Sequence, residues 1–161
     1  MSDTPKREMV TIDGATVTLS HSVSPIDNSS VEDGGGMFHH LDILDHRFRP
    51  ENYNKADGSP LRLFDADGVK IDLSKRSHED MGFWHRNVDY NEVIFCFRGA
   101  LRWETEMGTV TLRAGEMIVI PKGITHRSML CPESEEENIL LELKVRDALT
   151  YVGDETATRQ K

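Results

Sequence analysis

The stretch FWHRNVDYNEVIFCFRG, residues 83–99, decides the fold. It places His85 before a polar break and Glu92 at the start of an apolar run that ends at Gly99. Because alternate side chains share a face of a strand, one straight strand would point His85 and Glu92 to opposite faces. The intervening VDYN, residues 88–91, is rich in turn-forming residues and predicts a chain reversal. An antiparallel hairpin would then direct His85 and Glu92 to one inner face, where they can bind a divalent cation.

A second informative stretch is GEMIVIPKGITH, residues 115–126. Gly115 opens a short apolar strand, and Pro121, which lacks an N–H, suits its end. Gly123 can supply a positive φ in the turn that follows. His126 then begins the next predicted strand, so another side chain that can bind a metal ion lies at the start of a strand.

Pairing that strand beside the first hairpin would bring together His85, Glu92 and His126. Two imidazoles and one carboxylate on one face leave open positions for substrate and oxygen, as in the facial triad of non-haem Fe(II). Fe(II) is therefore the expected metal, with Mn, Ni or Zn as alternatives. The competing interpretation is a barrel that binds a ligand without metal or has only a structural role.

Most of the remaining chain consists of short apolar segments separated by turns. Residues 9–20 alternate around Asp13-Gly14, which is a strong hairpin signal, and residues 61–73 repeat the arrangement with a longer turn. Further candidate strands follow at regular spacing, at residues 83–87, 92–98, 100–105, 109–112, 117–120, 125–130 and 138–145. This pattern predicts an all-β sandwich or barrel. Residues 24–58 form a long irregular connection, which we expect to wrap the barrel, cover its mouth or reach a partner subunit.

The spacing of the first stretch resembles that of the cupins, small β-barrels of the jelly-roll type. Their first motif reads G-x5-H-x-H-x3-4-E-x6-G. This chain has His85-x-Asn87-x4-Glu92-x6-Gly99, with Arg86 between the first two positions. Asn87 therefore stands where the motif has its second histidine.

The second stretch resembles the second cupin motif, G-x5-P-x-G-x2-H-x3-N. Gly115, Pro121, Gly123 and His126 match it, and Leu130 replaces the final asparagine. The resemblance implies an all-β cupin double-stranded β-helix, a jelly-roll barrel, with an N-terminal β extension.

Three parts of the chain follow from this interpretation. Residues 1–58 are expected to form the N-terminal hairpin and a long loop packing on the barrel, residues 59–150 the cupin barrel, and residues 151–161 a C-terminal tail. We expect a homodimer formed through the outer sheet.

The asparagine at position 87 limits the resemblance to a smaller group within the cupins. His-Arg-Asn followed by a glutamate is similar to the homogentisate dioxygenase group, whose iron site uses two histidines and a glutamate. This resemblance implies that His85, Glu92 and His126 are the metal ligands of an Fe(II)-dependent dioxygenase acting on a small, aromatic, oxygenated substrate. The Asn87 amide would hydrogen-bond a metal-bound water or a substrate oxygen. The alternatives are a metal-assisted isomerase, lyase or decarboxylase, and a non-catalytic small-molecule-binding cupin.

Other side chains near these motifs have simpler expected roles. Arg98, Arg102 or Arg113 can hold a substrate carboxylate by a bidentate contact, and Arg98 is on the strand that carries Glu92. Cys96 shares the Glu92 face but lies roughly 13 Å along the strand, so we expect a buried thiol and not a ligand.

Composition excludes several partner classes. The 161 residues suit a single domain, and a formal charge of −9 argues against nucleic acid or an anionic membrane. No apolar run approaches the length of a membrane span, and MSDTPKREMV, residues 1–10, lacks the features of a signal peptide. Two cysteines, Cys96 and Cys131, are too few for a disulfide scaffold. We therefore expect a cytoplasmic protein whose partner is a small-molecule substrate.

Overall fold

The computed structural model describes residues 6–21, 38–77 and 79–153. Within these residues the structure is all-β, with ten strands and one short 3-10 helix, η1 (Glu51–Tyr53). The chain divides into two compact units between His40 and Leu41. Among the described residues, no helix has the length and apolar character needed to cross a membrane.

The first unit contains one antiparallel hairpin, made of β1 (Lys6–Ile12) and β2 (Ala15–His21). Asp13 and Gly14 join the strands with φ values of 49° and 78°. Two consecutive positive φ values are what a two-residue type I′ turn requires, and Asp-Gly is a favoured pair for it. The hairpin predicted from residues 9–20 is therefore confirmed.

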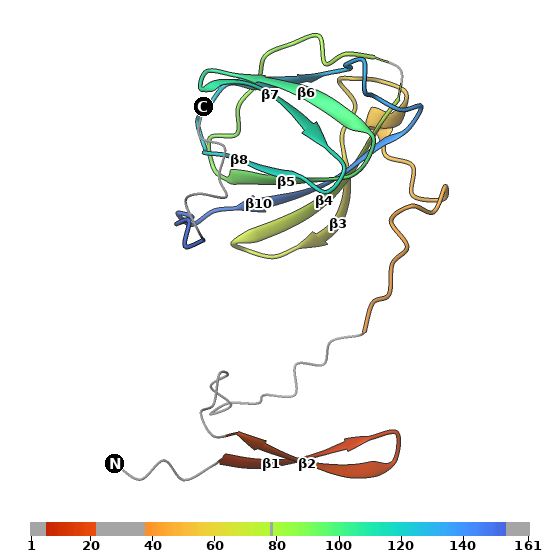
Figure 1. The fold of residues 1–161 in the computed structure, drawn as a ribbon, viewed down its shortest axis with the longest axis vertical. Helices are drawn as coiled ribbons and strands as arrows, with labels where there is room; N and C mark the ends of the chain where they lie inside the picture. Colours follow the sequence, from red (N-terminus) through yellow and green to blue (C-terminus); the bar gives the residue numbers. More distant parts are fainter. Residues whose placement is uncertain (1–5, 22–37, 78, 154–161) are drawn as a thin grey trace. The chain divides into compact units, whose positions relative to one another are not determined.

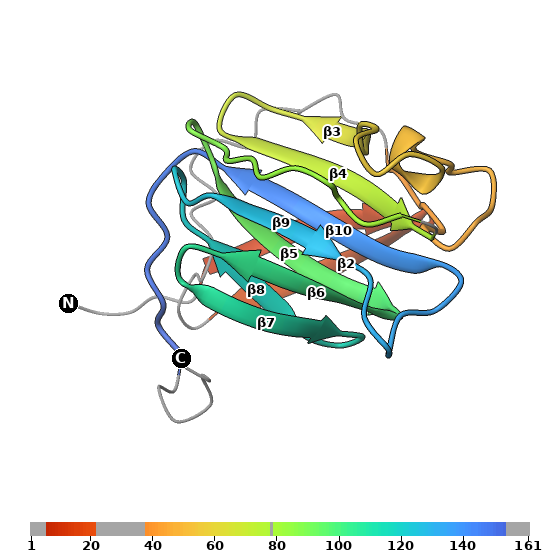
Figure 2. The ribbon, with the colours of Figure 1, turned by 90° about the horizontal axis from the view of Figure 1, so that it is seen from above.

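The second unit is a barrel of two antiparallel sheets, which face each other in Figure 1 and are seen from above in Figure 2. The larger sheet has the order β3 (Leu61–Asp65), β4 (Val69–Arg76), β10 (Asn138–Val145), β5 (Asn91–Arg98) and β8 (Met117–Ile120). The smaller sheet has the order β7 (Gly108–Arg113), β6 (Ala100–Thr105) and β9 (His126–Met129). Strands that are distant in sequence, such as β4 and β10, are neighbours, as a jelly roll requires.

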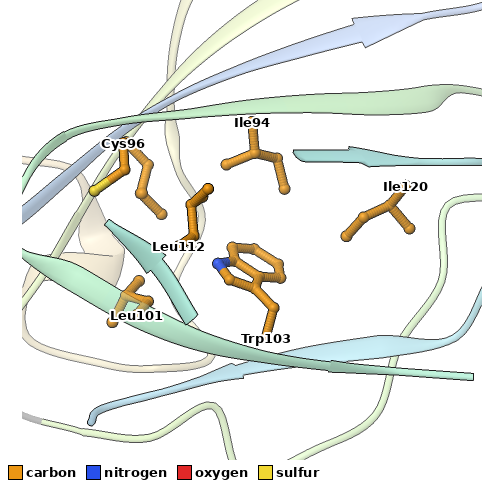
Figure 3. Close-up of a cluster of buried hydrophobic side chains, with 7 residues drawn as sticks. Ile94, Cys96, Leu101, Trp103, Leu112 and Ile120 are labelled. Atoms are coloured by element: carbon orange, nitrogen blue, oxygen red, sulfur yellow. The ribbon is translucent and has the colours of Figure 1, made fainter. Parts of the chain in front are cut away.

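Apolar side chains from both sheets meet inside the barrel. Ile94 and Cys96 from β5 face Leu101 and Trp103 from β6, and Figure 3 shows the cluster between the strands. The buried members are Ile94, Cys96, Leu101, Trp103, Leu112, Ile120 and Leu140. The expectation that Cys96 is a buried thiol is confirmed, and burial raises the pKa of this thiol to about 11.

Gly99, the last glycine of the first motif, makes the turn between β5 and β6. Its φ is 71°, and a Cβ at this position would collide with the side chain of Asn138. The Asn138 oxygen accepts the Ala100 N–H at 3.0 Å, and its amide donates to the Arg76 carbonyl at 2.9 Å. The glycine therefore makes room for a fully buried asparagine that ties three strands together.

A buried ion cluster lies on β4 and β10. Asp72 is 1% exposed, and its carboxylate contacts both Arg62 and, at 2.9 Å, the Nζ of Lys144. Arg62 also pairs with Asp65 at 2.6 Å. We call Asp72, Arg62 and Lys144 the closed cluster, because its buried carboxylate has two cationic partners.

One element differs from its expected form. Residues 83–87 do not form a strand of their own: His85 makes a single antiparallel bridge to His126 of β9. The chain then crosses to β5 in the opposite sheet, so the predicted hairpin between His85 and Glu92 is wrong. The reversal does occur, but it joins two sheets and not two paired strands. Of the long connection at 24–58, residues 22–37 lie outside the described part of the chain.

Candidate metal centre

A cavity of about 420 Å³ lies in the barrel and is lined from both sheets. The larger sheet contributes side chains of β4, β5 and β10, and the smaller sheet those of β6 and β9. The end of the long connection also lines it, through Asn52, Ala56, Asp57 and Gly58, as does Pro60 just after it. Asn52 anchors this segment, because its amide donates to the Ser74 hydroxyl at 2.9 Å and its oxygen accepts the Lys75 N–H.

Glu92 and His126 meet in this cavity from opposite sheets. His126 Nε2 lies 3.0 Å from Glu92 Oε2, and both side chains are buried. His126 Nδ1 lies 3.0 Å from the Ile124 carbonyl, which can only accept, so Nδ1 carries the proton. In a neutral ring, Nε2 then presents a lone pair to the carboxylate. Such a contact is stable only with a second proton on the ring or with a cation held by both groups.

The charges of this pair follow from its burial and contact. Burial acts to lower the pKa of His126, but the Glu92 carboxylate and the Ile124 carbonyl raise it overall. Burial likewise acts to raise the pKa of Glu92, and the contact with His126 lowers it overall. The pair thus favours a negative carboxylate facing a positive charge.

His85 stands directly beside this pair. Its backbone exchanges hydrogen bonds of 3.1 and 2.8 Å with His126, and the two rings lie edge to face with centroids 4.4 Å apart. Burial first, and His126 second, lower the pKa of His85, so its ring is neutral. Its Nδ1 is buried and has no hydrogen-bond partner among the described residues.

These three side chains suit a divalent cation in their donor chemistry. Imidazole nitrogen and carboxylate oxygen bind such ions at about 2.0–2.2 Å, so adjacent ligands of an octahedral ion lie about 3 Å apart. The separation of Glu92 and His126 matches this spacing. His85 Nδ1 is a buried polar atom without a hydrogen-bond partner among the described residues, and the close polar contact of Glu92 Oε2 is the one to His126 Nε2. In that part of the chain, no three His, Cys, Asp or Glu side chains already form a complete metal-binding group, so His85 lies next to an assembled two-ligand pair.

Asn87 has a defined backbone role. Its Oδ1 accepts the N–H groups of Asp89 and Tyr90, each at 3.1 Å, and its carbonyl accepts the Gly123 N–H at 2.6 Å. The side-chain oxygen therefore builds the turn by which the chain passes from His85 to β5. Asn87 also lines the cavity.

The structure does not bring the three arginines considered as carboxylate anchors into the cavity wall. Arg98 lies at the far end of β5 and approaches Glu137 at 3.5 Å. Arg102 contacts Glu104, and Arg113 pairs with Glu133 at 2.5 Å.

Sequence reasoning missed Arg76, which does line the cavity. It is the last residue of β4, where Asp72, Ser74 and Arg76 alternate and all are buried. Polar residues at alternate positions of a strand ordinarily indicate a face exposed to solvent, so the sequence pattern predicts an exposed Arg76 and not a buried one. On β10, Glu142 and Lys144 form a second inward polar row, and burial raises the pKa of Glu142.

Comparison with known proteins supports the fold. No family model matches the chain. A cupin-2 domain containing protein from Shewanella frigidimarina is 32% identical, the match covering 55% of this chain and 80% of that one, with a TM-score of 0.45. A "putative mannose-6-phosphate isomerase" from Ralstonia eutropha is 16% identical and has a TM-score of 0.54, with 68% and 99% of the two chains covered. The chain has the cupin fold.

Among curated proteins, this cupin is similar to "Putative dioxygenase SSO1533" from Saccharolobus solfataricus. The two are 28% identical over 66 residues, which is 41% of this chain. The match spans only 17% of the length of that relative.

Proposed function

We propose that this cupin is a metal-dependent enzyme, an Fe(II) dioxygenase acting on a small oxygenated substrate of the aromatic type. The observation that carries the proposal is the contact of His126 and Glu92 at 3.0 Å, beside the buried Nδ1 of His85, which has no hydrogen-bond partner among the described residues. The name of the curated relative supports the same reaction class. When bound, the metal would act as a Lewis acid and redox centre for substrate and oxygen.

The protein groups around the centre would position the substrate and exclude water. Ile94, Trp103 and Leu140 supply an apolar wall, which suits a flat organic ring. The Asn87 side chain lines the same cavity and would face an oxygen of the substrate. A volume of about 420 Å³ limits the substrate to a small molecule.

A second candidate is a metal-assisted isomerase, lyase or decarboxylase that uses no oxygen. The direction of the Glu142 pKa favours it, because burial raises this pKa and a raised carboxyl pKa moves the group toward the range in which a general acid works. Ser74 donates a hydrogen bond to this carboxyl, so its position is fixed.

The test is to purify the protein anaerobically, measure bound metal and follow O2 uptake with dihydroxybenzoates and related acids. Bound iron with substrate-dependent uptake supports the dioxygenase, whereas turnover without uptake supports the second candidate. His126→Ala should abolish both metal and turnover. His46→Ala is the matched control, since the side chain of this histidine is 93% exposed and lies in the long connection outside the cavity lining. A wild-type protein that takes up no metal after reconstitution would contradict both enzyme functions.

A further inference from the structure

We propose that Arg76 forms a carboxylate-binding subsite at the end of the cavity, so that the substrate is a small monocarboxylate. This subsite would name the substrate class of the proposed function, and it rests on that function for the end of the ligand that faces the metal.

Arg76 is only 4% exposed, yet its guanidinium contacts neutral acceptors. One terminal nitrogen donates to the Ser128 hydroxyl at 3.1 Å, and the other donates to the Glu79 carbonyl at 3.2 Å. These bonds use two of the five N–H groups of a guanidinium. No carboxylate lies within ion-pair distance of Arg76 in the described part of the chain.

This arrangement is unusual within the molecule. Seven other arginines each have a carboxylate partner, and all are more exposed than Arg76: Arg47, Arg62, Arg98, Arg102, Arg113, Arg127 and Arg146. Burying a charge without an ion partner is unfavourable, so a buried arginine that faces a cavity suits an anionic ligand. Arg7, Arg49 and Arg86 have no printed ion pair either, but they are exposed, so among the described residues Arg76 is the buried arginine without a carboxylate partner.

Three acidic groups, Glu142, Asp80 and Glu79, act on Arg76 through their charge, but none of them forms an ion pair with it in the described part of the chain. Asp80 accepts the Leu130 N–H at 2.6 Å, and Glu79 directs its carboxylate to the Ala56 N–H at 3.4 Å. Glu142 lines the same cavity, burial raises the pKa of its carboxyl, and its hydrogen bond is to the Ser74 hydroxyl and not to Arg76. The Arg76 guanidinium is therefore a cation without an ion pair, and a carboxylate of the ligand could bind to it.

The position of Arg76 relative to the metal centre sets the length of the ligand. Its partner Ser128 lies two residues after His126 on β9, and both side chains are buried on the same face. Two residues of a strand span about 7 Å. A small acid can place its carboxylate at Arg76 and an oxygen at His126 across this distance.

One guanidinium favours a carboxylate over a phosphate. A planar guanidinium matches a carboxylate with two parallel hydrogen bonds and cancels its single charge. Of the other cations in the cavity lining, Lys144 is half-buried and already paired with Asp72 at 2.9 Å, and Arg86 is exposed. A phosphate dianion would keep an uncompensated charge in this cavity.

The test compares benzoate with its neutral isostere benzamide, with inorganic phosphate as a third probe. Ligand-observed NMR titration gives the affinities, and metal content is measured on the same samples. The wild-type protein should bind benzoate more tightly than benzamide or phosphate. Arg76→Gln should weaken benzoate binding about 10- to 100-fold and remove its advantage over benzamide. Arg76→Lys, which keeps the charge but not the planar fork, should lie between them.

Two variants serve as controls for Arg76→Gln. Arg98→Gln removes an arginine outside the cavity and should bind benzoate as the wild type does, whereas Arg86→Gln tests the other arginine of the cavity lining as the rival anchor. Equal binding of benzoate and benzamide by the wild type would overturn the subsite, even if Arg76→Gln fails to fold. Phosphate binding tighter than benzoate, or loss of benzoate binding in Arg86→Gln alone, would also overturn it. Arg76-dependent benzoate binding by a protein that takes up no metal would support the subsite and contradict the proposed function.

Discussion

Two groups of charged and polar side chains lie inside this barrel, and they are built differently. In the closed cluster, Asp72 has both Arg62 and Lys144 as partners. In the cavity, Arg76 has no carboxylate partner among the described residues, His85 Nδ1 has no hydrogen bond there, and Glu92 contacts only the ring of His126. We call these cavity groups the open cluster. A satisfied buried network stabilises the fold, whereas an unsatisfied one is tolerated where a ligand completes it.

Removing the anion of the closed cluster should produce the largest effect on stability. Asp72→Asn leaves Arg62 and Lys144 without their buried carboxylate, so we expect a loss of about 3–5 kcal/mol in the free energy of unfolding. Urea unfolding followed by circular dichroism measures it. A loss below about 1 kcal/mol would show that the cluster does not hold the barrel together.

Removing the carboxylate of the open cluster should lower the affinity for metal and leave the free energy of unfolding nearly unchanged. Glu92→Gln keeps the shape of the side chain, and its amide can donate to His126 Nε2, so unfolding should change by less than about 1 kcal/mol. Metal affinity should fall at least about 100-fold, since even residues outside the ligand set cost 10- to 100-fold. Calorimetric titration with Fe(II) or Mn(II) measures the affinity, and unchanged binding would remove Glu92 from the site.

Acid should weaken the closed cluster in a defined direction. Burial acts to raise the pKa of Asp72, but hydrogen bonds from Arg62 and Lys144 lower it overall. A lowered pKa contributes stability above the ordinary carboxyl range, and that contribution is lost as the pH falls through the folded-state pKa. The stability difference between wild type and Asp72→Asn should therefore shrink between about pH 6 and pH 2. A difference that stays constant over this range would contradict an ionic role.

The smallest expected effect concerns the link between the cavity wall and the long connection. Ser74→Ala removes the acceptor of the Asn52 amide and the donor to Glu142. We expect a loss of about 1–2 kcal/mol and faster hydrogen exchange in residues 51–54, near η1. Ser128→Ala, which removes an acceptor of Arg76, is a comparison variant that should leave exchange in η1 unchanged.

The sequence predicted the local elements well because they depend on local chemistry. The Asp13-Gly14 turn and the strand that starts at Glu92 follow from turn residues and alternation, and the structure has both. The motif spacing also identified Glu92 and His126, which the structure brings into contact.

What the sequence did not predict depends on contacts between distant strands. The residues around Asn87 predict a turn but do not determine that the chain then enters the opposite sheet, so the sequence predicted a hairpin there. Arg76 was missed for a related reason. Its alternation with Asp72 and Ser74 looks solvent-facing until β10 and β9 enclose it.

Anaerobic titration of the wild-type protein and His126→Ala with Co(II), followed by its visible absorption, tests the metal centre most directly. The wild type should saturate at about one ion per chain, with a spectrum of nitrogen and oxygen ligands, and His126→Ala should show no saturable binding. The wild type failing to saturate, or His126→Ala binding with the same stoichiometry and spectrum, would contradict a metal centre at His85, Glu92 and His126.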